Sequence, residues 1–236
     1  MKRLLFAIFL LATFPALADD SNTVRLCTGS ANANYFAAGL AIQKMGGNAI
    51  TVDVIETEGT LDNLSMTLDK NECDAMIGQP DGPVYLARTS TGATKRLRQI
   101  ASLHREYLHV LCNKASGIDD LSDLNGKNGS LAIGEPGSGG WLIWQNIVHE
   151  DDSYASVPVT NESGIMALSA VSSGDTAVCM LVPAGLGNGT VREADMTFGD
   201  TLVLADADDK DFNDATDING NPLYTYDVDI PSGTYN

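Results

Sequence analysis

The sequence predicts an α/β fold with mainly parallel sheets. Short apolar, β-prone segments alternate with helical segments through the first half of the chain, and each strand ends in a polar or glycine-containing turn. Alternation of this kind is typical of parallel sheets, because each helix returns the chain to the start of the next strand. The roughly 220 residues that follow the N-terminal leader suit one large domain or two lobes.

The first two strands flank a predicted helix. Residues 23–27 are β-prone and end at the turn 28–30. A helix is expected over 34–45, where Gly46 and Gly47 stop it, and a second strand over 50–55. This segment therefore forms one strand–helix–strand unit.

A second helix and a third strand follow. Thr60 is expected to be the N-cap of the helix, which has leucines on one face. The third strand is expected over 73–78. Ligands bind beyond the carboxyl ends of parallel strands, so we expect the turns at 28–30, 58–60 and 79–81 to gather at one rim.

The second half continues the alternation. Residues 97–112 are predicted to form a strand and its connection, with His104 and His109 facing opposite sides of that strand. Further segments are a short helix at 119–127, a helix at 162–172 and a strand at 176–182. We divide the chain into a signal peptide at 1–18, a first α/β lobe at 19–108, and a second α/β lobe at 109–236 with an acidic C-terminal segment.

Residues 131–144 form a short apolar strand, a glycine-rich turn and the start of an apolar helix. The turn at 134–139 fits half of a P-loop, but Gly140 and Trp141 stand where Lys and Ser or Thr would be required. Ser138 lacks the flanking glycines of a nucleophile elbow. Two interpretations remain: Ser138 and the nearby N–H groups bind an anionic or polar solute, or Ser138 only caps the helix.

The N-terminus predicts export. A basic start, an apolar run over 4–15 and the small residues at 16–18 fit a secretory signal peptide cleaved after Ala18, which implies a periplasmic protein that is not membrane-embedded. The net charge of −17 disfavours nucleic acid as a partner. Four cysteines permit one or two disulfides, but the apolar surroundings of Cys27, Cys112 and Cys179 favour free, buried thiols.

Enzymatic signals are weak. The three histidines are scattered, and no nucleophile–base or metal-ligand set can be assembled. A calcium loop near Asp214 fails because Ala215 occupies a ligand position. We therefore predict a protein that is not an enzyme and that needs no cofactor or metal.

Several segments together resemble the TAXI family of solute-binding proteins, which serve TRAP transporters. Each segment is short, but they occur in the same order across nearly the whole chain. The matching segments are Cys27-Thr28-Gly29-Ser30 with Tyr35-Phe36, Glu58 to Leu64, Cys73 to Gln79 with Asp81, Leu97 to Leu103, Ile118 to Lys127 running into Gly134 to Gly139, Asn221 to Tyr224, and Ile230 to Tyr235.

The resemblance implies a two-lobed periplasmic-binding-protein-like fold, which closes on a small carboxylate or an amino acid such as glutamate and passes it to TRAP-type permease subunits. An alternative is a protein of the same fold that senses a ligand for a signalling partner; an exported enzyme is less favoured. By the resemblance, the ligand contacts are Gly29, Ser30, Tyr35, Thr60, Asn63, Gln79, Asp81, Ser138 and Gly139.

Overall fold

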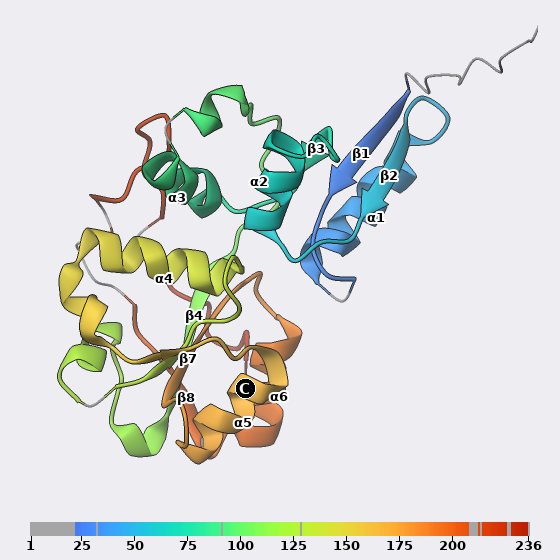
Figure 1. Ribbon diagram of the computed structural model, residues 1–236. Coiled ribbons are helices and arrows are strands. Elements are labelled where there is room, and N and C mark those ends of the chain that lie inside the picture. Colours follow the sequence, from blue (N-terminus) through green and yellow to red (C-terminus); the bar gives the residue numbers. More distant parts are fainter. Residues whose placement is uncertain are drawn as a thin grey trace, which may run out of the picture.

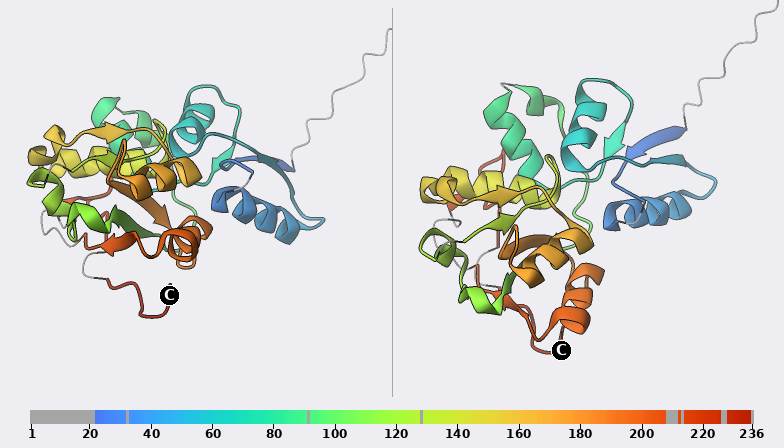
Figure 2. Two further views of the ribbon diagram at one scale, coloured as in Figure 1. Left: turned by 90° about the horizontal axis from the view of Figure 1, so that it is seen from below. Right: turned by 60° about the horizontal axis from the view of Figure 1, so that its bottom comes forward.

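Two separate β-sheets organise the chain in the computed structural model (Figure 1). The expected signal peptide lies outside the described residues. The N-terminal strands and their helix stand apart from the rest of the protein in every view (Figure 2). The structure describes residues 22–31, 33–90, 92–127, 129–207, 212, 214–225 and 228–235.

The first sheet has three parallel strands in the order β2-β1-β3. They are β1 (Thr23–Cys27), β2 (Thr51–Ile55) and β3 (Ala75–Met76). The central strand pairs along its whole length with β2, and its last two residues pair with β3. The prediction of a parallel sheet from the alternating pattern is confirmed here.

Three helices accompany this sheet: α1 (Asn34–Gly46), α2 (Thr60–Leu68) and α3 (Asp81–Thr89). The C-cap residue of α1 is Gly47, which has a φ of 55° that favours glycine. The expected N-cap role of Thr60 is wrong. The N-cap of α2 is Gly59, and the Thr60 hydroxyl instead accepts a hydrogen bond from the backbone N–H of Gln79, at 3.2 Å.

The second sheet has five strands in the order β6-β5-β7-β4-β8. Strand β4 lies between β7 and β8 and runs antiparallel to both, whereas β5 is parallel to β6 and to β7. This sheet is therefore mixed. The strands are β4 (Tyr107–Asn113), β5 (Leu131–Ala132), β6 (Val159–Thr160), β7 (Cys179–Ala184) and β8 (Leu202–Ala205).

Helices cover both faces of the second sheet, as Figure 1 shows. Alternate residues of each strand point to opposite faces, so Val110 packs in the core beneath α4 and Leu111 packs in the core beneath α5 and α6. The core of the first lobe is smaller and centres on Leu26, Val52 and Ile77. The helices are α4 (Gly139–Glu150), α5 (Gly164–Ser173) and α6 (Gly189–Phe198).

The connections differ from expectation at two places. His104 precedes β4 and lies in a segment without regular structure, so it does not share a strand with His109. The predicted helix at 119–127 is a short 3-10 helix, η3 (Leu121–Asn125), which begins at a capping box formed by Asp120 and Asp123. No helix in the described part of the chain is long and apolar enough to cross a bilayer.

All four cysteines are paired. Cys27 at the end of β1 bonds to Cys73, and Cys112 of β4 bonds to Cys179, which lies directly opposite it on β7. The expectation of free thiols is therefore wrong. Apolar surroundings do not distinguish a buried thiol from a buried disulfide, and the pairing partners are 46 and 67 residues apart in the sequence.

The Cys112–Cys179 disulfide should contribute strongly to stability, because it closes a long loop in the unfolded chain. We expect Cys112→Ala/Cys179→Ala to lower the free energy of unfolding by about 2–5 kcal/mol, measured by urea denaturation under oxidising conditions. The other disulfide remains in this variant as an internal control. A loss well below about 1 kcal/mol would show that this bond does not constrain the unfolded chain.

Candidate functional site

The three turns at the carboxyl ends of the first sheet are joined by one buried amide. The Asn63 Nδ2 donates to the carbonyl oxygens of Thr28, at 2.5 Å, and Ile77, at 2.8 Å. Its Oδ1 accepts from the Thr57 hydroxyl at 2.6 Å. The predicted convergence of the turns is confirmed, and Asn63 is its centre, with no exposed surface.

Five of the nine expected ligand residues lie outside the lining of the main cleft: Gly29, Ser30, Thr60, Asn63 and Asp81. Thr60 is buried under Gln79, and Gly29 is buried against the Tyr35 ring. Ser30 is exposed on the first turn. These residues build the rim of the first sheet.

A cleft of about 360 Å³ opens between the two lobes. The first residues of four helices line it: residues 33–35 at α1, 138–140 at α4, 163–164 at α5, and Asn188 with Thr190 at α6. The first N–H groups of a helix have no partner within the helix and carry partial positive charge. These N–H groups can therefore receive an anionic group, while Glu106 and Glu162 contribute carboxylates to the same lining.

The glycine-rich turn forms one wall of this cleft. Gly134 has a φ of 86°, and a Cβ there would lie 2.6 Å from the Ser138 Oγ. That oxygen accepts from the backbone N–H of Trp141 at 3.4 Å, so Ser138 caps α4 and also lines the cleft. Both interpretations of Ser138 from the sequence are compatible with this geometry.

The two lobes meet at Gly139. A Cβ on this residue would overlap the carboxamide of Gln79 from the first lobe. Only glycine lets Gln79 approach the N-terminus of α4 this closely.

Gln79 has one buried polar atom without a partner. Its Nε2 donates to Glu106 Oε2 at 3.0 Å, but its Oε1 has no hydrogen bond although it is shielded from solvent. Gln79 is 8% exposed and lines the cleft together with Glu106. A buried acceptor without a donor is uncommon and calls for a group that supplies one.

The surroundings of Glu106 have opposite effects on the pKa of its carboxyl group. Burial raises the pKa of its carboxyl group, and the hydrogen bond from His104, at 3.1 Å, partly offsets that increase. Burial also raises the pKa of the Tyr35 phenol, and the charge of Glu106 adds to this increase. Tyr35 therefore stays protonated and keeps a hydroxyl donor at the cleft.

Asp81 lies in a second polar cluster, away from the cleft lining. Its Oδ1 accepts from Asn146 Nδ2 of α4, at 3.0 Å, and from the Tyr224 hydroxyl. Arg88 donates to the Oδ1 of the same Asn146. Asp81 is 3% exposed, and this burial raises its pKa. The cluster ties α3 to α4 and to the C-terminal segment.

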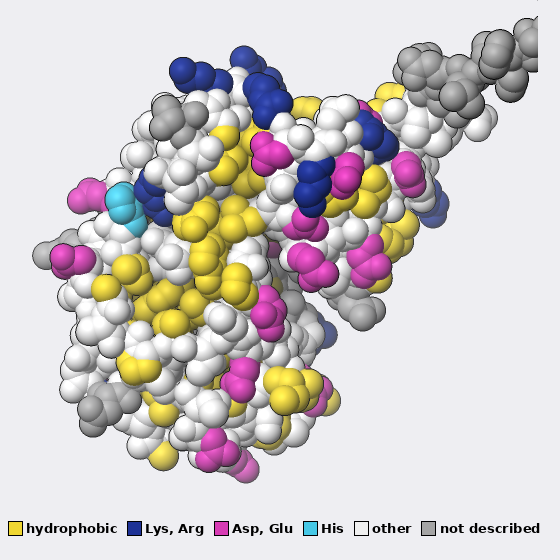
Figure 3. Space-filling model, viewed as in Figure 1, with side chains coloured by type: hydrophobic (Ala, Val, Ile, Leu, Met, Phe, Trp, Pro, Cys, Tyr) yellow, Lys and Arg dark blue, Asp and Glu magenta, His cyan; other side chains and the backbone are white. Residues whose placement is uncertain are grey.

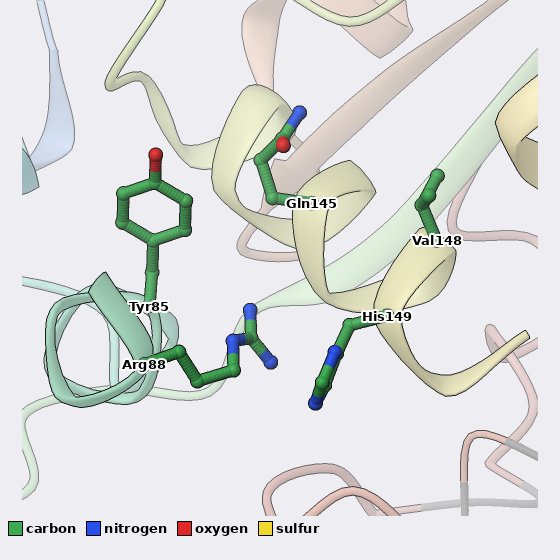
Figure 4. Close-up of a pocket in the computed structure, with 5 residues that line it drawn as sticks. All are labelled: Tyr85, Arg88, Gln145, Val148 and His149. Atoms are coloured by element: carbon green, nitrogen blue, oxygen red, sulfur yellow. The ribbon is translucent and has the colours of Figure 1, made fainter. Parts of the chain in front are cut away.

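A surface hollow of about 550 Å³ lies between α3 and α4. Tyr85 and Arg88 extend into it from α3, and Gln145, Val148 and His149 border it on α4, as Figure 4 shows. The guanidinium group of Arg88 donates a hydrogen bond to the buried Asn146 of the Asp81 cluster. The hollow is therefore a margin of the Asp81 cluster.

The structure brings four of the nine expected ligand residues into the cleft: Tyr35, Gln79, Ser138 and Gly139. Sequence reasoning missed Glu106, Glu162, Ser163 and Asn188. Ser163 and Asn188 are the N-cap residues of α5 and α6, so a search for Ser and Asn N-caps beyond the glycine-rich turn offered a signal for them. No comparable signal marks Glu106. In the described residues there is no group of three or more His, Cys, Asp or Glu side chains that could hold a metal ion.

A sequence profile of the NMT1-like family matches residues 26–236. The chain belongs to the NMT1-like family. No curated protein sequence matches it. The match covers both lobes and the C-terminal segment, so the NMT1-like assignment applies to the whole described fold.

Solved structures that resemble this NMT1-like protein are two-lobed. A Bordetella bronchiseptica RB50 protein has a TM-score of 0.55 at 16% identity, over 78% of this chain and 56% of that one. An ancestral arginine-binding protein bound to arginine has a TM-score of 0.52 at 16% identity, over 78% of this chain and 79% of that one. The periplasmic aliphatic sulphonate binding protein SsuA from Escherichia coli has a TM-score of 0.51 at 11% identity, over 78% of this chain and 60% of that one.

The fold class is thus confirmed: two α/β lobes of the periplasmic-binding-protein type. The chain spans little more than half the length of the Bordetella protein. The neighbours with named ligands bind small solutes, and at these identities their likeness concerns the fold.

Asn63→Ala should destabilise the first lobe, because it leaves the buried carbonyls of Thr28 and Ile77 without donors. We expect the free energy of unfolding to fall by roughly 2–4 kcal/mol in urea titrations. Asn48→Ala, at an exposed position, is the matched control and should change it by less than about 0.5 kcal/mol. An Asn63 variant as stable as the control would contradict the structural role.

Asp81 should give stability a defined pH dependence. Its pKa in the folded protein lies above the ordinary 3.8, so the folded state binds the proton more tightly than the unfolded state does. The wild type should therefore lose stability relative to Asp81→Asn as the pH rises above about 4, up to the folded-state pKa. Urea titrations of both proteins between pH 4 and 8 measure the difference, and a difference that does not vary with pH would contradict this.

Proposed function

We propose that this protein is an exported solute-binding protein that captures a small carboxylate-bearing solute between its lobes. Among such solutes we expect an amino acid to bind most tightly. The observation that carries the proposal is the unpartnered Gln79 Oε1 beside Glu106, in a cleft lined by helix N-termini. These groups have the complementary charges of the two ends of a zwitterion.

The carboxylate end fits the helix N-termini. Ser163 at α5 and Ala33 at α1 make no side-chain cap hydrogen bond, so the first N–H groups of these helices remain available. Ser138 and Asn188 add polar side chains at α4 and α6. Helix N-termini bind carboxylates without a cationic side chain, which matches a cleft that no Lys or Arg lines.

The amino end fits the opposite group. An ammonium placed at Gln79 Oε1 supplies the donor that this carbonyl lacks, and the carboxylate of Glu106 provides the opposite charge 3.0 Å from the same carboxamide. Tyr35 borders this end of the cleft. A carboxylate without an amino group would leave Gln79 Oε1 unsatisfied.

Function follows from movement of the lobes. The direct contact of Gln79 with Gly139 across the cleft describes a state in which the lobes touch. A solute that bonds to both walls stabilises this state relative to an open one, which is a ligand-shifted equilibrium between two conformations. No covalent step is required.

Delivery to a TRAP-type permease rests on the sequence resemblance to the TAXI family. Membership in the NMT1-like family and neighbours that bind arginine or sulphonates support the wider class of solute-binding protein. The proposed ligand contacts are Tyr35, Gln79, Glu106, Ser138, Gly139, Ser163 and Asn188.

The test is binding of paired solutes. We expect at least one L-amino acid to raise the melting temperature of the mature protein, because a ligand that binds the folded state stabilises it. In calorimetric titrations the matching carboxylate without the amino group should bind at least about tenfold more weakly, a difference of roughly 1.4 kcal/mol. L-Glutamate with glutarate and L-alanine with propionate are suitable pairs.

Glu106→Gln separates the two ends of the solute. This substitution should weaken the binding of the amino acid by about tenfold or more, and it should change the affinity for the carboxylate analogue by no more than about twofold. Glu58→Gln, at an exposed position away from the cleft lining, is the control and should change neither affinity. The proposal fails if no amino acid or carboxylate binds, or if Glu106→Gln affects both members of a pair equally.

A further inference from the structure

One segment of this acidic chain carries only positive charge. Residues 82–105 contain five of the 14 Lys and Arg side chains and neither Asp nor Glu, whereas the rest of the chain has nine basic against 31 acidic residues. Four of the five basic residues fall within residues 92–105, which we call the basic strap. Such a concentration sets up a local positive potential on a protein that is otherwise negative.

The basic strap lies on the surface. It consists of the 3-10 helix η1 (Ala93–Arg96) and a stretch without regular structure that leads to β4. Lys and Arg side chains gather over this part of the first lobe, at the top of Figure 3. Most residues of the strap, among them Lys95, Arg98 and Arg105, are exposed and can contact another molecule.

The Lys and Arg cations of the strap make no salt bridge among the described residues, although Arg98 donates to the backbone carbonyls of Lys95 and Leu97. Apolar side chains are exposed beside them: Ile100 is 89% exposed and Leu103 is 50% exposed. Unpaired cations around an exposed isoleucine have the composition of a protein-binding surface.

The basic strap is anchored at both ends. Arg96 donates to the backbone carbonyl of Leu68 at the end of α2. At the other end, His104 pairs with Glu106, whose carboxylate accepts from Gln79 in the cleft. The strap is therefore connected to the cleft wall through the hydrogen bond from His104 to Glu106.

We propose that the basic strap docks on an acidic surface patch of another protein, with Ile100 at the centre of the contact and Lys95, Arg98 and Arg105 around it. Charge complementarity favours this partner over an anionic membrane. An extended membrane surface would face the large negative charge of the rest of the chain, whereas a small acidic patch needs to meet only the strap within about 8 Å, the distance over which salt screens charges.

This surface does not depend on which solute fills the cleft, so it can be tested separately from the proposed function. The probe is p-benzoylphenylalanine, incorporated in place of Ile100 in the full chain expressed in its native cells. We expect irradiation to give one discrete adduct with a different protein, whose cross-linked peptide is rich in Asp and Glu. The adduct should decrease when the salt concentration is raised before irradiation.

Two matched variants test the charge. Lys95→Glu/Arg98→Glu should reduce the adduct by about tenfold or more. Lys44→Glu/Arg192→Glu makes the same change in net charge at exposed residues outside the strap, and should leave the adduct unchanged. Both variants should keep the melting temperature of the parent within a few degrees, which shows that folding is not the cause.

Other outcomes overturn the proposal. An adduct of twice the mass of the chain identifies a second copy as the occupant, and an adduct only with lipid identifies a membrane. Sedimentation with vesicles of 70% phosphatidylethanolamine and 30% phosphatidylglycerol tests the membrane directly, and we expect no binding. The absence of any adduct, or an adduct that charge reversal does not reduce, also contradicts a docking surface for an acidic protein.

Discussion

The approach of the Gln79 carboxamide to Gly139 is the contact on which the cleft depends. It brings the rim of the first sheet against the N-terminus of α4, and it requires that residue 139 has no side chain. Thr60 fixes the backbone of Gln79 from one side, and Glu106 fixes its carboxamide from the other. The position of this single side chain therefore results from α2, from the connection before β4 and from the glycine-rich turn together.

The sequence predicted the fold well where local signals agree with the tertiary structure. The first sheet, its helices and the meeting of three turns followed from strand–turn–helix alternation, because each element lies close in sequence to the next. A strand was predicted within residues 97–112, but the antiparallel direction of β4 was not, since its neighbours β7 and β8 come much later in the chain and no local pattern reveals the direction of pairing. The disulfides were missed because their cysteines are 46 and 67 residues apart, and no local pattern shows that they meet in the fold.

The cleft was predicted in part. Ser138 and Gly139 were found because an unusual turn before a helix is visible in one sequence window, and Tyr35 and Gln79 because their turns matched a family pattern. Asn63 and Asp81 belong to the same pattern, but both are buried and hydrogen-bonded to protein groups. Glu106 was missed because it directly precedes β4, 27 residues after Gln79, and only the folded chain brings the two side chains together.

The two disulfides have a mechanical consequence. Cys27–Cys73 lies within the first lobe and Cys112–Cys179 joins two strands of the second sheet, so both covalent links are internal to a lobe. Each half is thereby made stiffer, while rotation of one half against the other strains no covalent bond. Oxidation of this chain therefore stiffens each lobe separately and adds no covalent cross-link between the two lobes.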